Sequence, residues 1–534
     1  MTRQRRRQLD RTSFPALFLL FTFLAVTLFT VPRVGAQTST KGVSALDRVD
    51  QLRRAADQGI ASAQFDLAVM YDTGTGVAQD FAQALGWYRK AAEQGHADAQ
   101  FNLGVMYAKG AGADRDDTQA VLWYRKAAEQ GHARAQFNLG SMYANNTGVR
   151  QDYSQAVAWW RKAADQGHAG AQSNLALMYA AGRGIAQDYA QAVAWWRKAA
   201  EQGHAGAQYN LGVMYDSGSG VPRDYAQAIA WWRKAADQGD ASAQFSLGVR
   251  YESGKGVAED AAEAVQWHSL ASDQGDPSAH FNLGVMFDEG RGVSRDVAQA
   301  AQWWRRAAAR GNVNAALNLG VMYDSGIGVP QDSTQAVEWW SKAAEWGDAT
   351  AQLNLGVMYD EGRGVAQDYV QAVEWWSKAA KQGDARAQFN LGVMYDQGRG
   401  VEQDHVQAVD WWRKAAEQGD ATAQLNLGVM YASGSGVSQD HAQAVQWWRR
   451  AAEQGDAGAQ FNLGLSYRDG RGLPQDYPEA LMWLTVACTR MSGAESNKCA
   501  DVRDALARQL PAARAAAADR RAREWVETFE RRKP

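Results

Sequence analysis

One 36-residue unit repeats twelve times along this chain without an insertion or a deletion. The copies begin at residues 61, 97, 133, 169, 205, 241, 277, 313, 349, 385, 421 and 457, and residues 349–384 (ATAQLNLGVMYDEGRGVAQDYVQAVEWWSKAAKQGD) form a representative copy. A fixed period of this length is typical of a stacked solenoid, in which each unit packs on its neighbours. A solenoid repeats the same groups along a surface, whereas a catalytic centre needs one set of unlike groups. The register therefore favours a binding scaffold over an enzyme.

Each unit is predicted to contain two helices. In the representative copy, Asp348 is placed to cap a first helix that Gly362 ends. Asp368 is placed to cap a second helix that ends at Gly383. The second helix carries small and aromatic side chains at i, i+3, i+4 and i+7, which defines one apolar face. Two short helices cannot bury such a face alone, so we expect neighbouring repeats to cover it.

A pair of aromatic residues marks every second helix. The first of the pair is Trp in all twelve copies, and the second is Trp except where Tyr88, Tyr124, His268 and Leu484 replace it. A buried aromatic side chain removes about 150–250 Å² from water, which makes the pair the main source of stacking energy. Its strict period and the alanines around it favour a core role over the alternative of an aromatic ligand cage.

The repeated pattern A-x-A-Q-x-N-L-G-x-M-Y…G-x-G-V…D-Y-x-Q-A-V-x-W-W-x-K-A-A-x-Q-G resembles that of the Sel-one-like repeat (SLR) family, relatives of the tetratricopeptide (TPR) solenoids. The resemblance covers residues 61–492 and implies an all-α, right-handed superhelical solenoid of antiparallel helix pairs. Residues 46–60 resemble the second half of a unit and are expected to form an N-terminal capping half-repeat, after a short linker at residues 37–45. Residues 493–534 are similar to the closing helices of exported family members. The family implies an interaction scaffold or adaptor.

The beginning of the chain has the composition of an export signal. Residues 1–36 contain six arginines and one aspartate, an apolar run at residues 14–31, and small residues before Gln37. The run is near the lower limit for crossing a bilayer, so an uncleaved inner-membrane anchor is the alternative to a cleaved signal peptide. In both cases the repeats leave the cytoplasm, and we expect a periplasmic or secreted protein. The mildly acidic remainder argues against nucleic-acid binding.

The two cysteines, Cys488 and Cys499, lie close together near the end of the repeats. In an exported protein, this pair predicts a disulfide, and two buried thiols are the alternative. Two thiols without a neighbouring histidine do not make a metal site, so neither a metal nor another cofactor is expected.

A candidate partner-binding surface follows from the TPR-like arrangement, in which the first helices line the concave face. Positions 2, 5, 9 and 12 of the unit form a stripe there, in which position 5 is mostly aromatic, position 9 is mainly Val and position 12 is mostly acidic, and a column of asparagines lies beside it. An apolar stripe with an acidic edge suits a peptide that carries Lys or Arg. The alternative is structural: the amides satisfy backbone groups, the aromatics pack between repeats, and the acids are merely solvated. The predicted partner-binding residues are Asp216, Glu252, Asp288, Asp324, Asp360, Asp396, Asn282, Asn318, Asn354, Phe245 and Phe281.

Histidine is the one residue type that suggests chemistry. The column of His96, His132, His168 and His204 places its members at least about 10 Å apart, one per helix pair, so a shared metal is excluded and helix capping is predicted. His268, beside Ser269 and in the same copy as Glu252, could suggest a catalytic trio, but no pattern orders it.

We therefore predict a scaffold that binds another protein or peptide and has no catalytic residues. The alternatives are a β-lactamase-like hydrolase of the SLR family and a regulator of envelope or polysaccharide assembly. The hydrolase is disfavoured because the chain lacks the cysteine pair per repeat that marks the family members with β-lactam activity.

Overall fold

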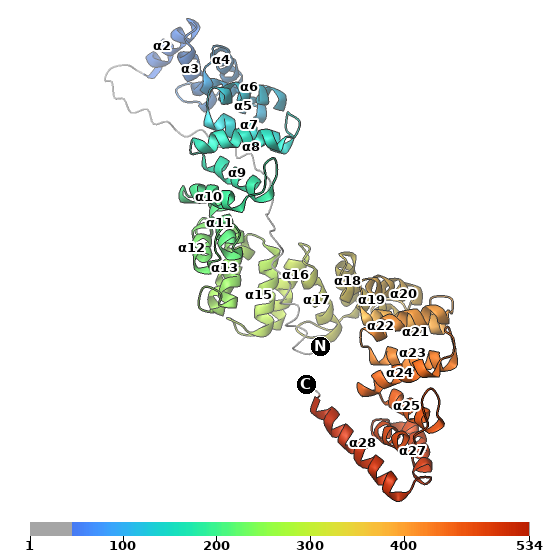
Figure 1. The fold of residues 1–534 in the computed structure, drawn as a ribbon. Coiled ribbons are helices and arrows are strands. Elements are labelled where there is room, and N and C mark those ends of the chain that lie inside the picture. Colours follow the sequence, from blue (N-terminus) through green and yellow to red (C-terminus); the bar gives the residue numbers. More distant parts are fainter. Residues whose placement is uncertain (1–44, 533–534) are drawn as a thin grey trace. The chain divides into compact units, whose positions relative to one another are not determined.

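The structure, a computed structural model, describes residues 45–532, and every regular element within that range is a helix (Figure 1). Each first helix packs on the second helix of its own repeat, and each second helix packs on the following first helix within the same unit. The all-α class and the solenoid of paired helices are thus confirmed. The chain forms two compact units, which divide after residue 274.

In the first unit, α2 (Ala45–Asp57) precedes the repeats. The first helices of its repeats are α3 (Ala61–Thr73), α5 (Ala97–Lys109), α7 (Ala133–Asn145), α9 (Ala169–Ala181), α11 (Ala205–Ser217) and α13 (Ala241–Ser253). The second helices are α4 (Phe81–Glu93), α6 (Asp117–Glu129), α8 (Tyr153–Asp165), α10 (Tyr189–Glu201), α12 (Tyr225–Ala236) and α14 (Ala261–Asp273).

In the second unit, the first helices are α15 (Pro277–Glu289), α17 (Val313–Ser325), α19 (Ala349–Glu361), α21 (Ala385–Gln397), α23 (Ala421–Ser433) and α25 (Ala457–Asp469). The second helices are α16 (Val297–Ala308), α18 (Ser333–Glu345), α20 (Tyr369–Lys381), α22 (His405–Glu417), α24 (His441–Glu453) and α26 (Tyr477–Cys488). Two further helices, α27 (Gly493–Ala507) and α28 (Ala512–Arg532), follow the last repeat, and α28 packs on α26.

Almost every repeat helix has an N-cap residue whose side chain accepts a hydrogen bond from a backbone N–H of the first turn. Before the first helices α5, α7, α9 and α11, a histidine accepts a hydrogen bond through Nδ1 from the backbone N–H three residues later, at 3.1–3.3 Å. From α13 onward, Asp or Asn takes the same place, as in the 2.7 Å bond from the Ala351 N–H to Asp348. Asp368 caps α20 in the same way. The predicted capping role of the histidine column is confirmed.

A glycine in the loop between the two helices of a repeat lies against the backbone of the repeat before it. Gly364 has φ +70°, and a Cβ atom there would lie 2.2 Å from the carbonyl oxygen of Ser333, the first residue of α18. No side chain fits in that gap, and the left-handed backbone also favours glycine. The loop of one repeat is therefore seated on the second helix of the repeat before it.

The second Trp of the pair forms the core of its repeat. A Cβ atom on Gly356 would lie 2.3 Å from Nε1 of Trp376, and that Nε1 donates to the Leu353 carbonyl at 3.1 Å. Where Ala176 replaces the glycine, the indole Nε1 of buried Trp196 has no hydrogen-bond partner. Glycine at this position therefore lets the ring reach the backbone of the first helix.

A ladder of glutamine side chains joins successive repeats, a feature that the sequence analysis missed. Buried Gln352 donates through Nε2 to the Ala344 carbonyl at 3.1 Å and accepts from Nε2 of Gln382 at 2.9 Å. The described repeats contain nine such glutamine pairs. His280 with Arg310, and Ala316 with Trp346, stand at the positions of the two pairs missing from α15–α18.

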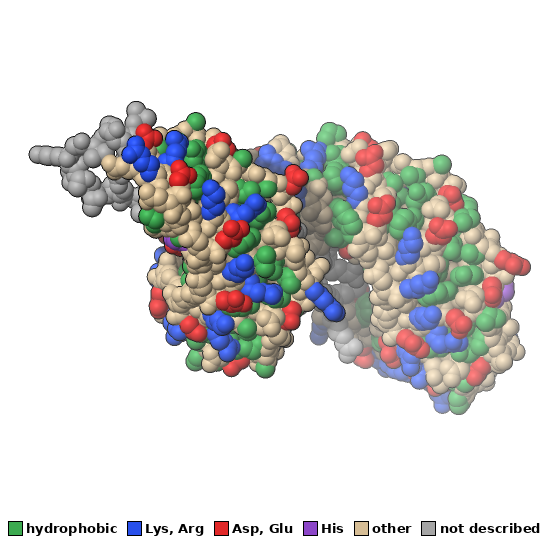
Figure 2. All heavy atoms as spheres, turned by 90° about the horizontal axis from the view of Figure 1, so that it is seen from above, with side chains coloured by type: hydrophobic (Ala, Val, Ile, Leu, Met, Phe, Trp, Pro, Cys, Tyr) green, Lys and Arg blue, Asp and Glu red, His purple; other side chains and the backbone are tan. Residues whose placement is uncertain are grey.

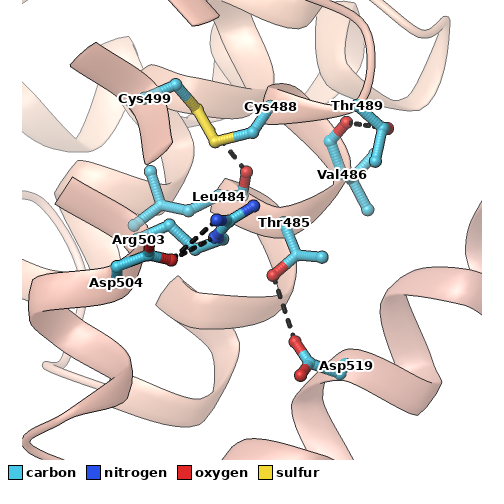
Figure 3. The surroundings of a disulfide bond; sticks show 9 residues. All are labelled: Leu484, Thr485, Val486, Cys488, Thr489, Cys499, Arg503, Asp504 and Asp519. Carbon is cyan, nitrogen blue, oxygen red and sulfur yellow. Dashed lines mark hydrogen bonds and ion pairs between the residues drawn. A yellow bond between two sulfur atoms is a disulfide. The ribbon is translucent and has the colours of Figure 1, made fainter. Parts of the chain in front are cut away.

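Near the end of the chain, Cys488 of α26 and Cys499 of α27 are joined, with their sulfur atoms 2.01 Å apart (Figure 3). On the same helix, the Thr485 hydroxyl lies 3.3 Å from the carboxylate of Asp519 in α28. The predicted signal segment, residues 1–36, lies outside the described residues. Within residues 45–532, no helix has both the length and the apolar character needed to cross a membrane.

Candidate partner-binding face

The predicted partner-binding residues all lie on first helices, but they are divided between the two units. Asp216, Phe245 and Glu252 belong to the first unit, and the other eight belong to the second. We call the side of each unit that carries these residues its first-helix face. The set therefore forms two separate stretches of surface.

In the first unit, Asp216 is the half-buried partner of a buried arginine. Its carboxylate lies 2.7 Å from the guanidinium of Arg250, which replaces the usual Met of its column and is 3% exposed. Asp216 is 14% exposed, and burial raises its pKa although the charge of Arg250 opposes the rise. The guanidinium also lies over the rings of Tyr225 and Trp232. This carboxylate holds two repeats together.

Glu252 and His268 approach each other, but they do not form a catalytic trio with Ser269. Nε2 of His268 lies 3.4 Å from the Glu252 carboxylate, and the histidine side chain has no exposed surface. Its ring packs on Gly248, as the core Trp does in other repeats. The Ser269 hydroxyl donates to the Val265 carbonyl of its own helix at 2.7 Å. The histidine thus occupies a core position without access for a substrate.

Phe245 and Phe281 of the aromatic column pack against the second helix of their own repeat. The ring of Phe245 lies 5.4 Å from that of His268, and the ring of Phe281 lies 6.5 Å from that of Trp304. Both phenylalanines are half-buried, as are Asn282, Asn318 and Asn354. These residues can contribute only part of their surface to a partner.

In the second unit, arginines of the next repeat neutralise part of the acidic column. The Asp324 carboxylate lies 2.7 Å from Arg363, and the Asp360 carboxylate lies 2.9 Å from Arg399. Each arginine follows its aspartate by 39 residues, which places it in the loop of the following repeat. The Asp288 carboxylate lies 3.9 Å from the guanidinium of Arg295, which belongs to the same repeat. The 39-residue spacing of Arg363 and Arg399 from their aspartates is visible in the sequence and could have predicted these ion pairs.

Asp396 differs from the other carboxylates of this column. Its ion partner among residues 45–532 is His405, whose Nδ1 lies 3.0 Å away. The residue 39 positions later is Ser435, which carries no charge. Asp396 is 33% exposed and lines a cleft of about 170 Å³ between α21 and α23. The other residues of the cleft are Val393, Gln397, Trp412, Asn426, Val429 and Met430.

The second helices present a mixed surface. The first Trp of most pairs is half-buried, and a cation three residues later covers its ring, as Lys378 covers Trp375 at 3.7 Å. Figure 2 shows Lys and Arg side chains scattered among Asp and Glu over the face that it displays. No cluster of metal-ligating side chains occurs among the described residues. The displayed face has no single sign of charge that would favour a nucleic acid.

The sequence profile of the Sel1 repeat matches twelve consecutive segments of this chain, which together span residues 61–490. The chain belongs to the Sel1 repeat family. Among solved structures, this Sel1 repeat protein is similar to c5321, a protective antigen of uropathogenic Escherichia coli strains that displays an SLR fold. The two are 39% identical with a TM-score of 0.67, and the match covers 83% of this chain and 95% of c5321.

A second solved relative is a Sel1 repeat protein from Oxalobacter formigenes. It is 34% identical with a TM-score of 0.48, and the match covers 60% of this chain and 98% of the relative. Comparison with curated proteins gives no significant match. Repeat solenoids of this kind typically bind other proteins along their surfaces.

Proposed function

We propose that this Sel1 repeat protein is an exported scaffold that binds a partner protein through the first-helix face of its second unit. The observation that carries this proposal is the repeated carboxylate column from Asp288 to Asp396, which runs beside half-buried apolar side chains at one residue per repeat. Regular spacing of this kind suits an extended partner segment that carries basic side chains. The carboxylates held by Arg363 and Arg399 would shape the face, and Asp396 would meet the partner.

Export is supported by the composition of residues 1–36 and by the similarity to c5321, a protective antigen. We propose that the chain is cleaved before Gln37, with a retained anchor at residues 14–31 as the alternative. Mass measurement of the protein purified from envelope fractions distinguishes the two. An intact amino terminus would contradict cleavage.

Export also favours the oxidised state of Cys488 and Cys499, because extracytoplasmic compartments preserve disulfides. We expect non-reduced peptide mapping to recover the two cysteines in one linked species. Two separately alkylated thiols in the protein from the envelope would contradict this proposal.

The hydrolase alternative has little support, because buried His268 and the Ser269 hydroxyl are both engaged inside their repeat. Regulation of envelope or polysaccharide assembly is a role that a scaffold could have through its partner. The identity of that partner would decide it.

Site-specific photo-crosslinking in cells tests the binding face. A benzoylphenylalanine at Asn354 or Val429 lies on the first-helix face, and matched probes at Val370 and Val406 lie on exposed sites of second helices. We expect a discrete crosslinked partner from the first two positions and none from the controls. Equal crosslinking from both sets, or none from the first-helix face, would contradict the proposed function.

A further inference from the structure

We infer that the cleft between α21 and α23 is the pocket that receives a Lys or Arg side chain of the partner. This inference rests on the proposed function and assigns one residue of the partner to one place on the face. The cleft, of about 170 Å³, is smaller than the roughly 300–1,000 Å³ of small-molecule sites. Its size therefore suits a single side chain.

The lining of the cleft matches the two parts of a basic side chain. Val393, Val429 and Met430 offer apolar surface for an alkyl stem, and Asp396 offers a carboxylate for the charged head. Lysine and arginine characteristically lay their stems on apolar surface while their charged ends stay polar. Val429 is 44% exposed, whereas the described residues at the same position of the other repeats are half-buried or buried. The apolar wall is thus accessible at this repeat.

The chain itself shows which group this position accepts. In the two preceding repeats, the equivalent carboxylates of Asp324 and Asp360 bind guanidinium groups supplied by the next repeat. At Asp396 the corresponding residue is Ser435, so the protein supplies no guanidinium there. His405 contacts one carboxylate oxygen, Oδ1, from the second helix of the same repeat. The partner's cation would take the place that Arg363 and Arg399 take in the preceding repeats.

A defined peptide tests the inference on the protein purified from the envelope. The probe is acetyl-Gly-Val-Arg-photoleucine-Gly-amide, and its counterpart contains neutral citrulline in place of arginine. We expect saturable photolabelling of residues 385–433 by the arginine peptide and about tenfold weaker labelling by the citrulline peptide, since a charge-assisted hydrogen bond is lost.

Two variants act on the cleft from opposite directions. Asp396→Asn removes the carboxylate charge, and Ser435→Arg supplies the missing guanidinium from within the chain. Each should reduce labelling about tenfold or more. The matched controls, Asp410→Asn and Val370→Arg, make the same changes of charge at exposed sites on second helices and should leave labelling unchanged.

Labelling that neither Asp396→Asn nor Ser435→Arg reduces would overturn the inference, as would equal labelling by the citrulline peptide. Either result leaves the proposed function standing if the cellular crosslinks from the first-helix face are still found. Absence of those crosslinks contradicts the proposed function itself, whatever the pentapeptide does.

Discussion

The repeats at residues 97–276 and those at residues 349–420 follow the same plan, but they place their ionisable side chains at different depths. In the first region, histidines cap the first helices α5, α7, α9 and α11, and Arg250 and His268 are buried. In the second region the caps are aspartates, and the Asp360–Arg399 pair lies at the surface. A solenoid can therefore vary either its interior or its face without losing its period. We expect acid sensitivity in the first region and partner recognition in the second.

The largest difference should appear when the arginine is removed from each ion pair. Arg250→Ala removes the buried member of its pair, leaves the half-buried carboxylate of Asp216 without its cation and should cost about 3–5 kcal/mol of local stability. Arg399→Ala breaks a more exposed pair, in which Asp360 and Arg399 are 26% and 37% exposed, and should cost about 0–1 kcal/mol. Hydrogen exchange resolved over α11–α14 and α19–α22 measures both.

The double variant Asp216→Ala with Arg250→Met is the control for this comparison. It restores the Met that other copies carry and should recover most of the loss. Equal losses for Arg250→Ala and Arg399→Ala would show that depth does not separate the two regions.

A smaller difference is expected at the glycine beneath the core Trp. Gly356→Ala would press a Cβ atom against Trp376 and break its bond to Leu353, with an expected loss of about 1–3 kcal/mol. The first region already contains this change as Ala176. There, Ala176→Gly should give the Trp196 indole a hydrogen-bond acceptor. The gain in stability should be offset by about 1 kcal/mol, because glycine is unfavourable within a helix.

Urea unfolding of both variants gives the comparison. A destabilising Ala176→Gly of the same size as Gly356→Ala would show that the α9–α10 pair has adapted to alanine by another route.

The smallest effect per residue concerns the caps, and it depends on pH. Burial lowers the pKa of His132, His168 and His204 below the ordinary value of 6.5; the nearby Arg134 adds to this for two of them, and Asp98 opposes it at His132. The stability from neutral caps is therefore complete above pH 6.5 and falls as the pH decreases through 6.5 toward the folded-state pKa values. A protonated Nδ1 also cannot accept the capping hydrogen bond.

Between pH 7.5 and 5, we expect the hydrogen-exchange protection factors, which are corrected for the intrinsic exchange rate at each pH, to fall in α7, α9 and α11 but not in α19, α21 and α23. Each cap contributes about 0.5–2 kcal/mol. The triple replacement of His132, His168 and His204 by Asp should remove this pH dependence, and a loss of protection that persists in that variant would assign it to other groups.

Much of the fold could be predicted from the sequence because local chemistry repeats in register. The caps at Asp348 and Asp368 and the histidine column follow from side chains that act on their own helix. The glutamine ladder could not be predicted, because Gln352 lies in α19, Gln382 follows the end of α20, and nothing local requires them to meet. The register also continues without a change past residue 274, where the chain divides into two units.

The candidate face was predicted only as a set of columns. The sequence shows that Asp324, Asp360 and Asp396 recur at one position of the repeat, and the prediction gave all three the same role. Their difference depends on whether the loop of the next repeat carries an arginine at the matching position. Local patterns give the direction of a side chain, whereas the neutralisation of its charge depends on packing between repeats.

The seating of Gly364 on the first turn of α18 also bears on how such a chain can change in evolution. An extra residue in the loop would move the glycine away from the Ser333 carbonyl and place a residue with a Cβ atom there. Selection should therefore eliminate insertions of less than one repeat. Duplication or loss of a complete copy keeps the contact between each loop glycine and the helix of the repeat before it. The gene can lengthen or shorten its product in whole repeats, by unequal recombination between copies, and each such step adds or removes one row of the binding face.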